Sequence, residues 1–194
     1  MRIFLLIFIS FFILSCKQNN DCSYYYDEYL NFYMKNDISQ AIDYINMAID
    51  CDKNNDNYKS DKVNLFIRIK KYDKALIAAN SMTVSSTSYL IKGVLLLKTN
   101  SKDSSNIAFI KALKKLRQLK NSKNLNKNAL FSIDYNITIL SYHLEGHNKG
   151  IQILNRFKLK HKTDYQKEML NSLQNMIMNL DSKTILFNLF GIEM

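Results

Sequence analysis

An amphipathic helical pattern repeats within this chain after 34 residues, and this repeat constrains the fold more than any other feature. The segment 37–49 places its apolar side chains on one face of a helix. The segment 72–82 repeats that pattern, and Ala75 aligns with Ala41. Each unit is therefore expected to be two helices joined by a tight turn. The preceding helices are expected at residues 24–35 and 59–70, and the turns at Asn36-Asp37 and Lys70-Lys71.

The composition favours the same helical prediction. Proline is absent, and glycine occurs only four times among the 194 residues. A β-sandwich or barrel needs many turns rich in these residues, whereas uninterrupted helices need few. The chain is therefore expected to be all-α, and a generic helical bundle is the alternative to a repeat array.

The first unit resembles the tetratricopeptide repeat family, in which the repeat is about 34 residues long. It contains the pairs Ala41-Ile42 and Ala48-Ile49, followed by the exit segment 52–55, where Lys53 stands in place of the family's proline. Small residues of this kind let paired helices approach closely. The first unit is the best match, and the second unit aligns with it over the same helix.

Two weaker units follow, with Gly93 and Gly150 at positions where the family has a small contact residue. The resemblance covers about residues 22–160 and implies an α-α superhelix of about four hairpins. Solenoids need terminal caps, because each end otherwise exposes an apolar face. The segments 165–180 and 184–190 are expected to be these capping helices.

The first sixteen residues have the pattern of an export signal. Arg2 precedes an apolar run, residues 3–14, which is too short to cross a bilayer because a spanning helix needs about 20 apolar residues. The run ends in Ile13-Leu14-Ser15-Cys16, which resembles the lipobox of bacterial lipoproteins. That resemblance implies that Cys16 becomes the new N-terminus and carries the acyl chains.

The predicted organisation is a cleaved signal at 1–15, a short tether at 16–21 and one helical-repeat domain at 22–194. Lys17 follows the lipidated cysteine where other lipoproteins have aspartate, a feature similar to lipoproteins sent to the outer membrane. The expected location is therefore the cell envelope, with the protein lipid-anchored in the outer membrane on either face.

Two cysteines, Cys22 and Cys51, remain after Cys16 is acylated. In a helical hairpin the start of the first helix lies beside the end of the second, so these two residues are expected to be near neighbours. An oxidising compartment then allows a disulfide between them. The alternative is a pair of semi-buried thiols.

The mature chain is strongly basic, since 26 basic and 17 acidic side chains remain, a formal net charge of +9. Residues 111–127 contain seven Lys or Arg and no acidic residue, while Ile110, Leu113, Leu116 and Leu119 are expected to form the buried side of that helix. The hypothesis for this surface is contact with anionic lipid through Lys114, Lys115 and Arg117. The alternative is a solvated helix face. Nucleic acid is not an expected partner for an exported lipoprotein.

No catalytic or metal-binding motif is found in the sequence. It contains no glycine-rich phosphate loop and no Gly-x-Ser-x-Gly nucleophile motif. His143 and His147 have zinc-ligand spacing only if one helix carries both, and Gly146 is expected to break that helix. A calcium loop beginning at Asp52 lacks its closing glutamate, because Val63 stands there. A non-enzyme without metal or cofactor is therefore expected.

The resemblance implies that a ligand binds in the groove lined by the first helix of each hairpin. Tyrosine with Arg and Asn suits a protein or peptide ligand, because aromatic rings supply contact area and polar groups supply register. The leading hypothesis is a non-catalytic, lipid-anchored adaptor, and the alternative is a ligand-capturing lipoprotein of a nutrient-uptake system. The groove residues carried over from the family are Tyr26, Tyr33, Asn64, Arg68, Lys98 and Tyr142.

Overall fold

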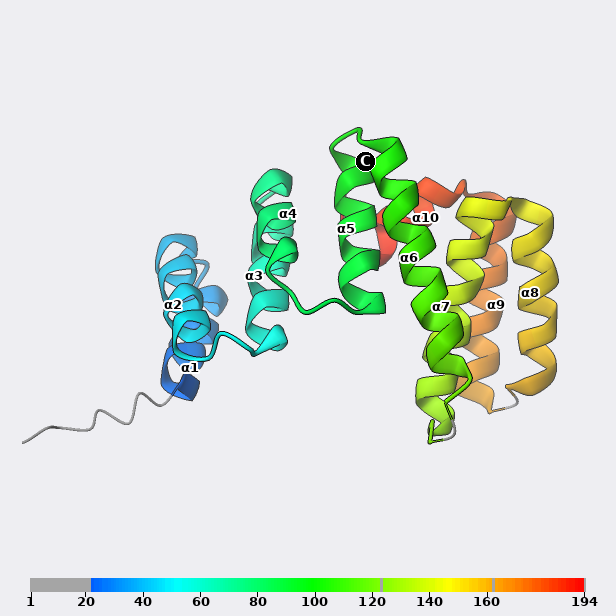
Figure 1. Ribbon diagram of the computed structural model, residues 1–194, viewed down its shortest axis with the longest axis horizontal. Coiled ribbons are helices and arrows are strands. Elements are labelled where there is room, and N and C mark those ends of the chain that lie inside the picture. Colours follow the sequence, from blue (N-terminus) through cyan, green and yellow to red (C-terminus); the bar gives the residue numbers. More distant parts are fainter. Residues whose placement is uncertain (1–21, 123, 162, 194) are drawn as a thin grey trace, which may run out of the picture. The chain divides into compact units, whose positions relative to one another are not determined.

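A computed structural model describes residues 22–122, 124–161 and 163–193. These residues form ten α-helices and no β-strand. The predicted signal and Cys16 lie outside the described residues. In chain order the helices are α1 Cys22–Met34, α2 Ile38–Cys51, α3 Asp56–Arg68, α4 Tyr72–Asn80, α5 Ser86–Lys98, α6 Lys102–Lys120, α7 Lys127–Glu145, α8 His147–Lys160, α9 Asp164–Asn179 and α10 Ser182–Leu189 (Figure 1).

Eight of these helices pair as consecutive hairpins, namely α1/α2, α3/α4, α5/α6 and α7/α8. The chain divides into two compact parts, residues 1–53 and 54–194. From here on, these two parts, and not the single repeats, are called the first unit and the second unit. The first unit contains the α1/α2 hairpin and the second contains α3–α10. The predicted fold class is confirmed: the described chain is an all-α set of tetratricopeptide-like hairpins followed by two further helices.

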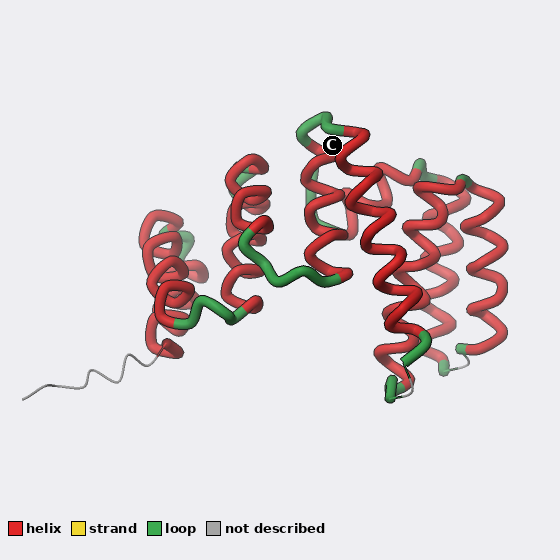
Figure 2. The backbone as a smooth tube through the Cα atoms, in the orientation of Figure 1, coloured by secondary structure: helices red, strands yellow, loops and turns green. Residues whose placement is uncertain are grey.

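The turns within the first three hairpins share one backbone conformation. Asn36, Lys70 and Asn100 all have a left-handed conformation, with φ between 59° and 61°. The residue after each donates its backbone N–H across the helix end, for example from Lys71 to the carbonyl of Phe66 at 2.9 Å. The predicted turns at Asn36-Asp37 and Lys70-Lys71 are therefore confirmed, and short turns join the two helices in each case (Figure 2).

The first unit has a small core closed by a disulfide. Tyr29 is buried on α1, and Ala41, Ile45 and Ala48 are fully buried on α2. Cys22 begins α1 and Cys51 ends α2, and a disulfide joins them with their Cα atoms 5.5 Å apart. The hairpin geometry that was expected to bring these cysteines together is present.

In the second unit, small residues set the closest helix contacts. Gly93 of α5 lies directly against the ring of Phe109 on α6, so a Cβ at position 93 would collide with that ring. Ser105 donates its hydroxyl to the carbonyl of Gly93 at 2.7 Å, which adds a buried hydrogen bond at the same crossing. Gly150 also approaches Tyr142 closely, and a Cβ there would lie 2.8 Å from the Cβ of Tyr142. Both glycines are therefore packing residues, as the resemblance implied.

The two helices after the fourth hairpin have different positions. α9 packs against α8 and α7 and so covers that end of the second unit. α10 turns back and packs against α7, α5 and α9 instead of extending the stack. The sequence therefore predicted both closing helices, of which α10 packs on the first helices α5 and α7 of the second unit.

α6 extends to Lys120, and α7 begins at Lys127. α6 and α7 each contain 19 residues, compared with 13 in α5. No helix in the described part of the chain is both long and apolar enough to span a membrane.

Candidate functional site

The structure separates the predicted groove residues into three groups. Tyr26 and Tyr33 belong to the first unit, where their rings lie 5.6 and 5.7 Å from that of the buried Tyr29. They are half-buried parts of a tyrosine cluster on α1. Asn64 and Arg68 are exposed on α3 of the second unit. Their role in partner binding stays a prediction.

Lys98 and Tyr142, the remaining groove residues, contact the chain's own C-terminal segment, defined as residues 180–193. The ammonium of Lys98 lies 5.5 Å from the ring centre of Phe187 and 5.2 Å from that of Tyr72, close enough for cation–π attraction. It also donates a hydrogen bond to the backbone carbonyl of Glu193. The C-terminal segment therefore occupies the surface of α5 where a ligand was expected.

The same segment crosses α7. Tyr142 donates its hydroxyl hydrogen to the carbonyl of Leu180 at 2.8 Å, and Nδ1 of His143 lies 2.9 Å from the hydroxyl oxygen of Ser182. Burial and the charge of Asp181 raise the pKa of Tyr142. Burial, together with the nearby Lys102 ammonium, lowers the pKa of His143, although Asp181 opposes that change. These groups hold the start of α10 on the first helices.

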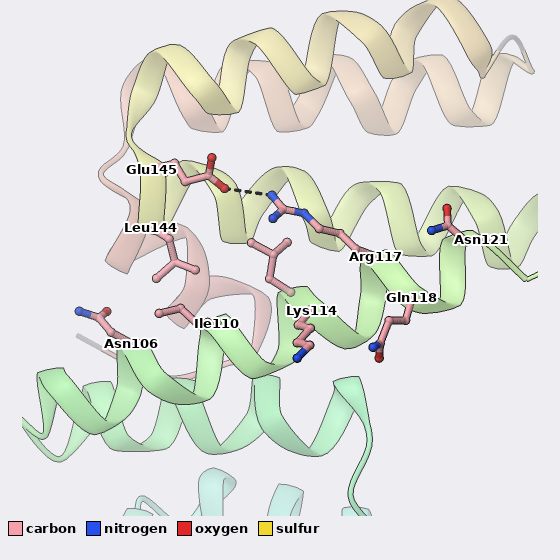
Figure 3. A pocket seen from close by; sticks show the side chains of 9 residues that line it. Asn106, Ile110, Lys114, Arg117, Gln118, Asn121, Leu144 and Glu145 are labelled. Atoms are coloured by element: carbon pink, nitrogen blue, oxygen red, sulfur yellow. Dashed lines mark hydrogen bonds and ion pairs between the residues drawn. The ribbon is translucent and has the colours of Figure 1, made fainter.

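A different surface, on α6, is open. A cavity of about 690 Å³ lies between α6 and the C-terminal end of α7 (Figure 3). Arg117 reaches from α6 toward α7 and forms a 3.1 Å ion pair with Glu145 (Figure 3). The lining residues are Asn106, Ile110, Leu113, Lys114, Arg117, Gln118, Asn121, Leu144 and Glu145.

Large apolar side chains are exposed at this surface. Ile107 is 54% exposed and Ile110 is 56% exposed, although other apolar residues of α6 are buried. Leu119 is 45% exposed and lines a smaller cavity on the other side of α6 with Val84. The expectation that Ile110 and Leu119 are buried beside Leu113 and Leu116 was therefore wrong.

The register of α6 explains this difference. Its buried stripe runs through Ser105, Ala108, Phe109, Ala112, Leu113 and Leu116 at helical spacing. Ile107 and Ile110 fall outside that stripe. Leu119 lies in the final turn of a helix that is six residues longer than its partner α5, so less of the neighbouring helix covers it.

Cations surround these apolar residues. Lys114 and Arg117 line the cavity, Lys115 is half-buried beside Leu119, and Lys111 lies 5.7 Å over the ring of Tyr89. We call the surface formed by Ile107, Ile110, Lys114, Arg117, Leu144 and Glu145 the α6 surface. It offers apolar contact area within a charged rim, which is the anatomy of a binding surface for another macromolecule.

The histidines lie on separate elements. His143 belongs to α7, and His147 begins α8 after Gly146, which has φ of 92° and breaks the helix as expected. Among the residues that the structure describes, no group of three or more His, Cys, Asp or Glu side chains is placed to hold a metal ion.

No family model matches the sequence, and no curated protein matches it. Among solved structures, the crystal structure of MamA protein is similar to this chain, with a TM-score of 0.48 and 16% sequence identity over 71% of each chain. The fold assignment rests on the hairpins, turns and close helix contacts of this chain itself.

Proposed function

We propose that this protein is a non-catalytic helical-repeat adaptor that binds a protein partner through the α6 surface and is held at the cell envelope by a lipid on Cys16. The observation that supports it most is the exposure of Ile107 and Ile110 beside a cavity of about 690 Å³. Exposed apolar residues in a contiguous group favour an interaction site, because burying them against a partner releases water from apolar surface.

The C-terminal segment already covers part of the first-helix surface in the second unit. Glu193 accepts a hydrogen bond from Lys98, and Leu180 accepts one from Tyr142. A partner at that position would have to displace contacts that bury Ile185, Leu186 and Phe187. The α6 surface requires no such displacement.

The anchor is a separate part of the proposal and has its own test. Cys16 precedes the described residues by six positions, so a lipid there would hold the first hairpin within about 20 Å of a membrane. Labelling cells with an alkyne fatty acid should mark the wild-type protein and leave Cys16→Ala unlabelled. Equal labelling of both would exclude this anchor.

Partner binding is tested by affinity purification from detergent-solubilised envelopes. The wild-type protein should recover a specific partner, and Ile107→Glu/Ile110→Glu should lose at least about tenfold of it, because charges replace the apolar contact. The matched control is Ile77→Glu, since Ile77 is an exposed isoleucine on α4. Loss of the partner in both variants, or in neither, would contradict binding at the α6 surface.

A further inference from the structure

A second groove, between α6 and α8, adjoins the α6 surface. Its volume is about 320 Å³, and Arg117 lines both cavities. Five of its eight lining residues are Lys or Arg and none is acidic, which sets it apart from the α6 cavity with its Glu145. The lining residues are Arg117, Lys120, Ile137, Lys149, Ile153, Arg156, Phe157 and Lys160.

The cations of this groove are of two kinds. Some form ion pairs with carboxylates of the fold, and the others, which we call the unpaired row, do not. Lys120 pairs with the buried Asp134, whose other oxygen lies 3.2 Å from Nε2 of His161. Among the described residues, Lys149, Arg156 and Lys160 form no ion pair. In the described part of the second unit, no carboxylate therefore forms an ion pair with these three cations of α8.

The unpaired row is regular. Lys149, Arg156 and Lys160 lie on one face of α8, because they are separated by seven and four residues. Seven residues of helix correspond to about 10.5 Å. Ile153 lies between the first two cations, and the groove floor is apolar, with Phe157 and Ile137 only 3% and 5% exposed. The pattern along α8 is thus cation, apolar, cation, cation.

From this row we infer that the α6/α8 groove binds an acidic amphipathic helix of a protein partner. Two helices packed side by side share the same periodicity, so carboxylates seven residues apart on the partner meet Lys149 and Arg156 while an apolar side chain between them contacts Ile153. The carboxylates supply the charge that the groove lacks. This inference deepens the proposed function, on which it rests, by giving the chemistry of the partner.

The shape of the groove favours a helix over a lipid surface. The apolar floor at Ile137 and Phe157 lies below a rim of long cationic side chains on two helices. A flat bilayer contacts the ends of such side chains. A helix with projecting apolar side chains also contacts the half-buried Ile153 between the cations, so it gains apolar contact in addition to charge attraction.

The experiment measures peptide binding to the chain from residue 16 onward carrying Cys16→Ala, which retains every described residue. The probe is a fluorescent synthetic helix of about 20 residues with Glu repeating about every seven positions on one face and Leu between them. A scrambled peptide of identical composition is the matched probe control. Fluorescence anisotropy gives Kd at about 0.15 M salt, and vesicles containing anionic phospholipid are measured in parallel.

Binding of the patterned peptide at least about tenfold tighter than the scrambled one is expected. Arg156→Glu/Lys160→Glu should raise Kd at least about tenfold, and the charge-neutral pair Arg156→Gln/Lys160→Gln should raise it less. Lys71→Glu/Lys74→Glu, exposed on the α3/α4 hairpin, makes the same charge change elsewhere and should alter Kd less than about threefold. Unchanged thermal unfolding confirms that each variant folds.

Three results would overturn the inference: no peptide binding, equal binding of both peptides, or equal effects of the groove and control variants. Vesicle binding that depends on Arg156 and Lys160 without peptide binding would assign the groove to lipid instead. If the peptide fails but envelope purification still recovers an Ile110-dependent partner, only this inference falls. If both fail, the proposed function falls with it.

Discussion

Glu193 and Lys70 form a 2.6 Å ion pair that joins the C-terminal segment to the turn between α3 and α4. The hydrogen bond from the Lys70 ammonium lowers the pKa of Glu193 and raises that of Lys70. Both side chains are largely exposed, so the pair fixes the position of the segment more than it stabilises the fold. The stabilising contribution comes from apolar side chains of α10.

Phe187 is the main anchor of that segment, because it is only 1% exposed and its ring faces the Lys98 ammonium. Phe187→Ala should lower the free energy of unfolding by about 3–5 kcal/mol, measured by urea denaturation. Leu189 is 41% exposed on the same helix, and Leu189→Ala should cost less than about 1 kcal/mol. Equal costs at the two positions would show that α10 is not docked as described.

His143 should make the second unit less stable in mild acid. Burial and Lys102 lower the pKa of His143 in the folded chain below the unfolded value of about 6.5. At a pH between these two pKa values, the unfolded chain therefore binds more protons than the folded chain. The free energy of unfolding therefore falls as the pH drops through about 6.5 and levels off below the folded pKa. His143→Asn should remove this part of the pH dependence in denaturation curves from about pH 7.5 to 5.5. An unchanged pH dependence would contradict the buried neutral imidazole.

The fold was predictable because its signals are local. Helical periodicity, the 34-residue spacing from Asn36 to Lys70 and the scarcity of glycine all act within one or two neighbouring helices. The close approach at Gly93 also follows from a repeat position. The path of α10 depends instead on contacts between positions far apart in the chain, such as Lys70 with Glu193, which periodicity does not encode.

The α6 surface was only partly predictable. The cations at Lys114, Lys115 and Arg117 are visible in the sequence as a run without acidic residues. The exposure of Ile110 was missed because Ile110 was assigned to one face with Leu113, Leu116 and Leu119, each three residues apart. Strict use of the helical angle would have separated them, since at about 100° per residue each step of three residues shifts the direction by about 60°. The cavity itself requires the end of α7, which no local pattern places beside α6.

Asn100 offers a test of the shared turn geometry. Its left-handed backbone costs free energy in any residue with a side chain, so Asn100→Gly should stabilise the second unit by about 0.5–1 kcal/mol. Ser172→Gly, at an exposed interior position of α9, should instead destabilise it by about 0.5 kcal/mol. Thermal unfolding of the two variants gives the comparison, and destabilisation by Asn100→Gly would contradict the turn.

The Cys22–Cys51 disulfide should be present in protein isolated from an oxidising compartment. The bond joins two cysteines that are 29 residues apart in the sequence. Peptide mass mapping without reductant should therefore recover the two cysteine-containing peptides joined by a disulfide. Cys22→Ser/Cys51→Ser should destabilise the first hairpin by about 3–4 kcal/mol and increase its proteolysis. Recovery of two free thiols from the exported protein would contradict the bond.

The most direct test of the account places a photo-crosslinking amino acid at Ile110 in cells that make the full chain, with the same substitution at the exposed Ile77 as control. One discrete protein adduct is expected from position 110, absent from position 77 and lost when Arg156→Glu/Lys160→Glu is added. Absence of any protein adduct at position 110, or the same adduct from both positions, would contradict the claim that the α6 surface binds the partner.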